Sequence, residues 1–189
     1  MFQAFLIKYG EIAIKGKNRY LFEDALVAQI RHALKQAEGS FRVTKEQGRI
    51  YVEALEAFDY EEAAEALKRV FGIVGICPVV ILEDEGFARL AEEVVSYIEK
   101  RYGDCAKTFK VQTRRARKTY PKESMEINAE LGGKILEHFP GMKVDVHHPE
   151  LTFYVEIRER IYLYSEVIRG PGGMPVGTNG KSMLLLSGG

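Results

Sequence analysis

The sequence predicts an α/β protein built from two small domains. In residues 1–82, short apolar runs typical of strands alternate with stretches whose apolar residues recur every three or four positions, as in amphipathic helices. Residues 83–168 repeat this alternation in a different order. In residues 169–189 periodicity gives way to glycine and proline, which indicates a connecting segment.

The first block is expected to follow the order β-α-β-β-α-β. Its strands are expected at residues 2–9, 41–45, 50–54 and 73–82. The first helix should run from Asn18 to Glu38 and stop at Gly39, while Asp59 should cap a second helix that ends at Gly72. This order is that of a ferredoxin-like unit, which we assign to residues 1–82.

The second block, residues 83–168, is expected to contain two helices and four strands. The helices are expected at residues 87–102 and 124–139, and the strands at residues 109–113, 144–147, 151–157 and 161–168. Residues 169–181 are expected to form a linker, and residues 182–186 the start of a buried strand. Because a buried strand needs partners, we expect the sequence to stop inside a third domain.

Composition excludes few functions. Lys plus Arg number 27 and Asp plus Glu number 27, so net charge alone suggests no nucleic-acid partner, although the local distribution of charge decides such binding. Cys77 and Cys105 are far apart and lack metal-ligand spacing, as expected of reduced cytosolic thiols. Charge appears as early as Lys8, and no apolar run approaches the roughly 20 residues of a membrane span. We expect a soluble, cytoplasmic protein.

Positive charge is concentrated between Lys107 and Lys122, where seven cations occur without an acid. A solvated loop between a strand and a helix would explain such a run. However, Phe109 and Tyr120 lie among the cations, as aromatic residues do in single-strand nucleic-acid sites. The run also leads to a helix N-terminus near Ser124, where unpaired N–H groups favour an anion. These features favour a nucleic-acid contact.

A second basic segment, residues 15–19, lies at the start of the first expected helix. A cation at the N-terminus of a helix interacts unfavourably with the helix dipole, and each one destabilises the helix by roughly 0.3–1 kcal/mol. Three cations around Gly16 therefore suggest a phosphate contact, whereas a plain helix capped by Asn18 explains the segment equally well.

Three further motifs carry weaker expectations. Gly132-Gly133 costs about 1 kcal/mol per glycine inside a helix, and close packing explains it better than an approaching RNA backbone. His147-His148 is expected to be a strand end, not part of a metal site. Ser187-Gly188-Gly189 after an apolar strand could begin a turn that holds phosphate.

Four stretches together resemble the tRNA 4-thiouridine synthetase family, the tRNA sulfurtransferases that are also linked to thiamine biosynthesis. The first is Tyr9-Gly10-Glu11-Ile12-Ala13-Ile14-Lys15-Gly16-Lys17-Asn18-Arg19, and the second runs from Arg114-Arg115-Ala116-Arg117-Lys118 through Tyr120-Pro121 to Glu126-Ile127-Asn128. The third is Gly170-Pro171-Gly172-Gly173-Met174-Pro175-Val176-Gly177, and the last is Leu184-Leu185-Leu186-Ser187-Gly188-Gly189. The resemblance covers the whole chain in order.

The resemblance implies a ferredoxin-like domain at residues 1–82, a THUMP domain at residues 83–168 that binds the tRNA acceptor 3′ end, and then a PP-loop domain. In that family the PP-loop domain uses ATP and Mg²⁺ to adenylate uridine 8, and a persulfide sulfur displaces AMP. A cysteine desulfurase would be the sulfur donor, and a homodimer is one assembly to expect. Only Ser187, Gly188 and Gly189 of the ATP site are present, so the chain should bind tRNA and catalyse nothing.

No catalytic or metal-binding residue is expected within the chain. The residues expected to bind RNA are Lys15, Lys17, Asn18, Arg19, Lys110, Arg114, Arg115, Arg117, Lys118, Tyr120, Lys122 and Asn128. Three other functions remain open at this point. They are a THUMP RNA-binding module of another tRNA-modifying enzyme, a ferredoxin-like metabolite-binding regulatory domain, and a protein-interaction domain whose basic face binds the acidic surface of residues 56–99 of another copy of the chain.

Overall fold

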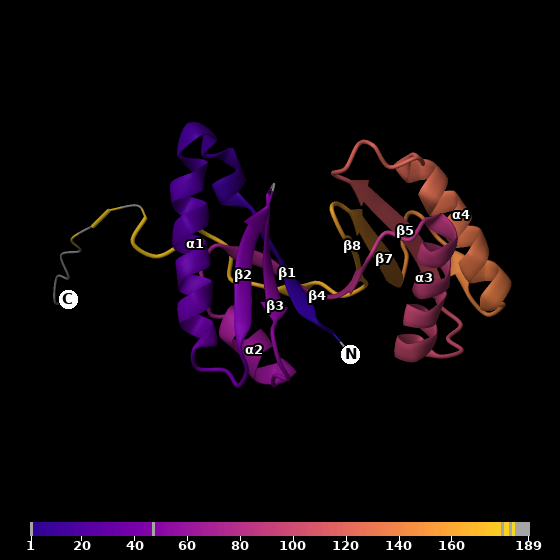
Figure 1. Cartoon of the computed structure of the whole chain (residues 1–189), viewed down its shortest axis with the longest axis horizontal. Coiled ribbons are helices and arrows are strands. Elements are labelled where there is room, and N and C mark those ends of the chain that lie inside the picture. The colour runs from indigo at the N-terminus through magenta and orange to yellow at the C-terminus, as the bar shows by residue number, and fades with distance from the viewer. Residues whose placement is uncertain (1, 47, 179, 182, 184–189) are drawn as a thin grey trace, which may run out of the picture. The chain divides into compact units, whose positions relative to one another are not determined.

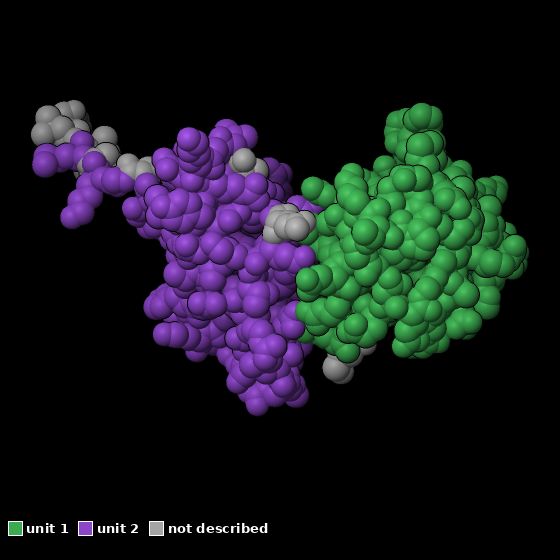
Figure 2. Space-filling view, turned by 45° about the horizontal axis from the view of Figure 1, so that its top comes forward, with its two compact units in different colours: residues 1–3, 78–166 green, residues 4–77, 167–189 purple. Residues whose placement is uncertain are grey.

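The computed structural model describes residues 2–46, 48–178, 180–181 and 183 and consists of two compact units (Figures 1 and 2). Unit 1 contains residues 1–3 and 78–166, and unit 2 contains residues 4–77 and 167–189. Each unit has its own hydrophobic core. None of the helices in the described part of the chain is long and apolar enough to cross a membrane.

Unit 2 has the ferredoxin-like order of elements. They are β1 (Ala4–Tyr9), α1 (Arg19–Leu34), β2 (Phe41–Glu46), β3 (Arg49–Ala54), α2 (Tyr60–Leu67) and the first half of β4 (Ile73–Leu82), joined later by β9 (Ile168–Arg169). The sheet order is β2-β3-β1-β4, and β9 pairs antiparallel with β4. The ferredoxin-like prediction is therefore confirmed.

Local sequence explains the elements of unit 2. The Asp59 side chain accepts a hydrogen bond from the Glu62 N–H at 2.9 Å, so the predicted cap of α2 is confirmed. The hairpin of β2 and β3 turns at Gly48, whose φ of +84° is strained for other residues. Two short 3₁₀ helices that the sequence did not predict, Glu11–Ile14 and Gly16–Asn18, precede α1.

Unit 1 places two helices against a mixed sheet. The helices are α3 (Phe87–Tyr102) and α4 (Ser124–His138), and the strands are the second half of β4, β5 (Thr108–Arg115), β6 (Lys143–Val144), β7 (Leu151–Ile157) and β8 (Ile161–Tyr164). The strand order is β4-β8-β7-β5-β6, with β6 and β7 parallel to β5. The core lies between this sheet and both helices (Figure 1).

Two expected strands of the second block are shorter in the structure. The strand expected at residues 144–147 ends at Val144, because the Asp145 carboxylate accepts the N–H groups of His147 and His148, each at 2.9 Å, and forms a turn. The strand expected at residues 161–168 is divided into β8, in unit 1, and β9, in unit 2.

The segment expected as a linker lies against unit 2. Gly172 accepts a hydrogen bond from Gly72 N–H and donates one to the Ile73 carbonyl, both at 2.7 Å. Further along, the Gln29 side chain donates to the Val176 carbonyl at 2.9 Å. Of the expected strand at residues 182–186 only Met183 is described, and Ser187, Gly188 and Gly189 lie outside the described residues.

Candidate nucleic-acid interface

The predicted basic run follows β5 and the connection from β5 to α4. Along β5 the buried side chains of Phe109, Val111 and Thr113 alternate with side chains that are more exposed. The connection after Arg115 begins with hydrogen bonds from the N–H groups of Ala116 and Arg117 to the Ile157 carbonyl. The cations are therefore held on an ordered backbone and divide into two groups by their partners.

Three cations of the run have acidic partners inside unit 1. The side chain of Arg115 is 10% exposed and donates to the Tyr120 carbonyl at 3.2 Å and to Glu123. Arg117 pairs with Asp84. Lys122 binds Glu126 at 2.9 Å and Glu130 at 2.7 Å, and the carboxylates of Glu130 and Glu126 raise its pKa. These pairs shape the loop and neutralise part of its charge.

The other four cations have no acidic partner within the described part of the chain. They are Lys107, Lys110, Arg114 and Lys118, of which Lys110 is half-buried and the others are exposed. Exposed charges without partners remain available for phosphate groups. They form the strongest part of the candidate interface, and we call them the unpaired cations of unit 1.

The N-terminus of α4 is already occupied by the chain's own carboxylates. Glu123 is the N-cap residue and forms a capping box with Glu126, whose carboxylate accepts the Glu123 N–H at 3.3 Å. The Glu123 carboxylate accepts the Glu126 N–H, and the two negative charges lie at the positive end of the helix dipole, where they would repel a phosphate. The expectation that the helix end near Ser124 receives a phosphate is corrected accordingly.

Two of the expected RNA-binding residues are placed in structural roles. Tyr120 is 5% exposed and packs in the core of unit 1, with the Arg117 guanidinium 5.6 Å from its ring centroid. Its ring is therefore not open to a base, and burial raises its pKa. Asn128 accepts the Thr113 N–H at 2.8 Å and so links α4 to β5.

In unit 2 the basic segment at residues 15–19 is also divided. Arg19 donates to Glu23 at 2.6 Å and to the Tyr9 hydroxyl at 3.0 Å, and Tyr9 in turn donates to Glu23. Burial, followed by the Glu23 hydrogen bond, raises the pKa of Tyr9. Lys15 lies over the Phe22 ring at 5.1 Å, whereas Lys17 is exposed and has no partner among the described residues. Asn18 is the N-cap of α1, but its side chain makes no capping bond.

Sequence reasoning missed Tyr20, which is 56% exposed beside this segment. An exposed aromatic ring next to Lys17 is a better candidate for stacking on a base than the buried Tyr120. The helical period places Tyr20 on the same face of α1 as Val27, seven residues later, and Val27 is buried. The sequence pattern therefore predicts that Tyr20 is buried as well. Only the structure shows that the core does not extend to the first turn of α1.

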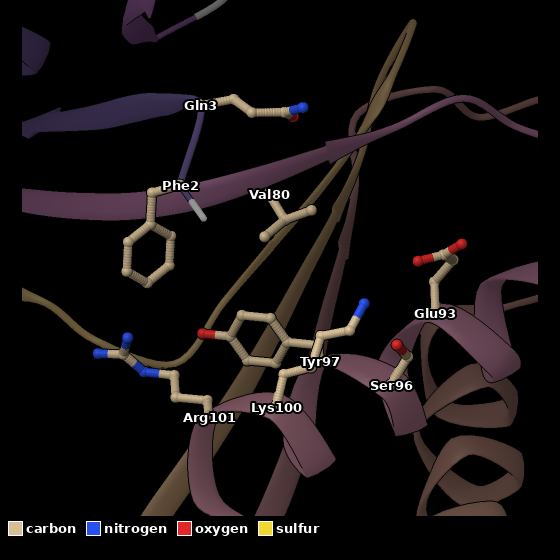
Figure 3. Close-up of a pocket in the computed structure, with 8 residues that line it drawn as sticks. All are labelled: Phe2, Gln3, Val80, Glu93, Ser96, Tyr97, Lys100 and Arg101. Atoms are coloured by element: carbon tan, nitrogen blue, oxygen red, sulfur yellow. The ribbon is translucent and has the colours of Figure 1, made fainter. Parts of the chain in front are cut away.

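A small cavity in unit 1 has a volume of about 270 Å³ and is drawn in Figure 3. It is lined by Phe2, Gln3, Val80, Glu93, Ser96, Tyr97, Lys100 and Arg101. Tyr97 shares a 2.7 Å hydrogen bond with Ser165, and Arg101 pairs with Glu166 at 2.5 Å. Both groups thus have internal partners, and we assign this cavity no role in the interface.

Metal ligation finds no support in the described residues. No group of three or more His, Cys, Asp or Glu side chains in that part of the chain is placed to hold a metal ion. His147 and His148 lie in the turn that Asp145 organises.

Replacing Arg115 and replacing Lys118 should have different effects. Arg115→Ala removes the hydrogen-bond donor to Glu123 and to the Tyr120 carbonyl, so we expect the free energy of unfolding to fall by about 1–3 kcal/mol. Lys118→Ala removes an exposed side chain and should change stability by less than about 0.5 kcal/mol. Urea unfolding of both variants measures these two changes in the free energy of unfolding. Equal stability losses would contradict the division into paired and unpaired cations.

Comparison with known proteins identifies both units. Residues 4–77 match the family model described as the ThiI ferredoxin-like domain, and residues 85–166 match the THUMP domain. The chain is thus a protein of the class that joins these two domains.

A probable tRNA sulfurtransferase of Lachnospira eligens is 62% identical over 190 residues, which cover 100% of this chain and 48% of the relative. A crystal structure from Pyrococcus horikoshii Ot3 matches with a TM-score of 0.81 and 33% identity, covering 94% of this chain and 58% of that one. A crystal structure of a 4-thiouridine synthetase–RNA complex with bound ATP matches with a TM-score of 0.79 and 33% identity, over 100% of this chain and 47% of that one.

The chain belongs to the tRNA sulfurtransferase family, as the sequence resemblance predicted. It spans about half the length of the curated relatives that it matches.

Proposed function

We propose that this chain is the RNA-binding part of a tRNA sulfurtransferase that makes 4-thiouridine at position 8 of tRNA. Its own task is to hold the acceptor end of the tRNA. The observation that carries this proposal is the set of unpaired cations in unit 1, Lys107, Lys110, Arg114 and Lys118. They lie within the region that matches the THUMP domain.

Two further observations support RNA as the partner. A solved relative with 33% identity over the whole of this chain is a 4-thiouridine synthetase in complex with RNA. In addition, Lys17 and the exposed Tyr20 ring of unit 2 provide the cation and the aromatic face that single-stranded nucleic acids require. Phosphate contacts would fix the position of the RNA, and ring contacts would hold unpaired bases.

We assign the remaining steps of the reaction to the part of the relatives that this chain does not span. ATP with Mg²⁺ would activate the uridine oxygen as a leaving group, and a cysteine desulfurase would supply the sulfur. The residues described here would take part in neither step, and their contribution would be to bind and orient the tRNA. A homodimer and a cytoplasmic location are also part of this proposal.

Salt dependence of tRNA binding tests the proposal. Six cations of the two basic segments lack an acidic partner among the described residues: Lys15, Lys17, Lys107, Lys110, Arg114 and Lys118. With about four to six phosphates neutralised, a plot of log affinity against log salt should have a slope of roughly −3 to −5. Fluorescence anisotropy with labelled tRNA at several salt concentrations gives this slope. A slope near zero, or no binding at low salt, would refute the proposal.

A further inference from the structure

Residues 168–178, which we call the strap, lie along unit 2, although their glycines and prolines are typical of a connecting segment. The strap begins as β9, which pairs antiparallel with β4. Beyond β9, Gly170 donates to the Val74 carbonyl at 3.2 Å and Gly172 to the Ile73 carbonyl at 2.7 Å. The backbone groups of a free connection would bind water instead. The strap is therefore part of the fold of unit 2.

The strap lies this close to β4 because residue 170 is a glycine. A Cβ atom built on Gly170 would be 2.3 Å from the Ile73 carbonyl oxygen, so one of the two segments would have to move. The glycines of α4 differ in this respect. A Cβ on Gly132 or Gly133 would meet no atom within 4 Å among the described residues, apart from the helix's own backbone, so the close packing expected there is wrong. The close approach that requires a glycine is found in the strap.

A single side chain of α1 holds the far end of the strap (Figure 1). The Gln29 amide donates to the Val176 carbonyl at 2.9 Å, and its oxygen accepts the Val176 N–H at 3.4 Å. Gln29 thus binds both backbone groups of one residue, as a neighbouring strand would. Between the two ends, Met174 packs against the core of unit 2. Thr178 then closes a turn by donating to the Pro175 carbonyl at 2.6 Å.

We propose that the strap is a rigid connection to the catalytic part of the full-length enzyme, and that Gln29 is the residue that positions it. This rests on the proposed function, which assigns catalysis to residues beyond this chain. A flexible connection would let the catalytic part sample many positions, whereas a docked strap restricts it to those near the bound tRNA. The strap should therefore affect turnover and not the affinity for tRNA.

Hydrogen exchange measured by mass spectrometry tests whether the strap is docked. Gln29→Ala removes both hydrogen bonds to Val176, so the amides of residues 172–178 should exchange about tenfold faster. Gly170→Ala should accelerate exchange along the whole strap, because its methyl group would collide with the Ile73 carbonyl.

The matched control is Gln36→Ala, which removes the same type of side chain just after α1. Gln36 is exposed, and its side chain makes no hydrogen bond within the described part of the chain. This variant should leave the exchange of the strap unchanged. If Gln29→Ala exchanges no faster than Gln36→Ala, the strap is not held by Gln29 and the inference fails, while the proposed function stands.

Turnover of the full-length enzyme tests the positioning role. Gln29→Ala should lower kcat for 4-thiouridine formation by about tenfold and leave the Kd for tRNA within about twofold of the parent value. Gln36→Ala should change neither. Faster exchange with an unchanged kcat would overturn the positioning role, and so would a loss of tRNA affinity that accounts for the lower rate. A parent enzyme that forms no 4-thiouridine would overturn the proposed function itself.

Discussion

Arg158→Met is expected to destabilise the chain by about 3–5 kcal/mol, the largest effect on stability that we predict. Arg158 and Glu156 form a pair at 3.2 Å, with side chains 2% and 3% exposed. The Tyr164 hydroxyl also donates to Glu156 at 3.1 Å. Methionine would preserve much of the side-chain volume but remove the cation that pairs with a buried carboxylate, and the neutral Tyr164 hydroxyl cannot replace that charge.

An exposed pair provides the control. Lys45 and Asp24 lie 2.5 Å apart with side chains 38% and 61% exposed, so Asp24→Asn should cost less than about 1 kcal/mol. Urea unfolding followed by circular dichroism gives both free energies. The account of the buried pair fails if the two substitutions cost the same.

Replacing Lys17, Arg114 and Lys118 together by alanine should produce the largest loss of RNA affinity. Each phosphate contact contributes about 0.7–0.9 to the salt slope, so three lost contacts should weaken binding by roughly 100-fold to 500-fold at about 0.1 M salt. All three side chains are exposed and have no acidic partner among the described residues, so stability should change little. Anisotropy with labelled tRNA measures the loss.

Reversal by salt provides an internal check on this prediction. At about 1 M salt the triple variant and the parent should bind tRNA with similar, weak affinity, because the contacts that the substitutions remove are electrostatic and are screened at that salt concentration. A loss that is independent of salt concentration would mean that the substitutions act through the fold. An affinity equal to that of the parent at low salt would remove these three residues from the interface.

Local patterns were sufficient to predict most of the fold. The spacing of apolar residues predicted α3 and β7 with the bounds that the structure shows, and Asp59 predicted the start of α2. The strand predicted at residues 144–147 is too long because the hydrogen bonds of one side chain end it early. Asp145 turns the chain after Val144 although the following residues are compatible with a strand.

The candidate site could be predicted only as a region. Sequence locates the cations between Lys107 and Lys122, but it cannot show that Arg117 pairs with Asp84, which lies 33 residues earlier. Nor does it show that Tyr120 is buried while Tyr20 is exposed, because both depend on where the core ends. Partner and burial information of this kind comes from tertiary structure alone, and it decides which cations remain available.

The most direct test of the central claim compares two double variants that remove the same net charge. Arg114→Ala with Lys118→Ala takes away two unpaired cations, whereas Arg117→Gln with Lys122→Gln takes away two that already bind carboxylates. We predict that the first lowers the magnitude of the tRNA salt slope by about 1.4–1.8 and that the second leaves it nearly unchanged. Equal reductions in both would contradict the claim, because net charge, and not the unpaired cations, would then govern binding.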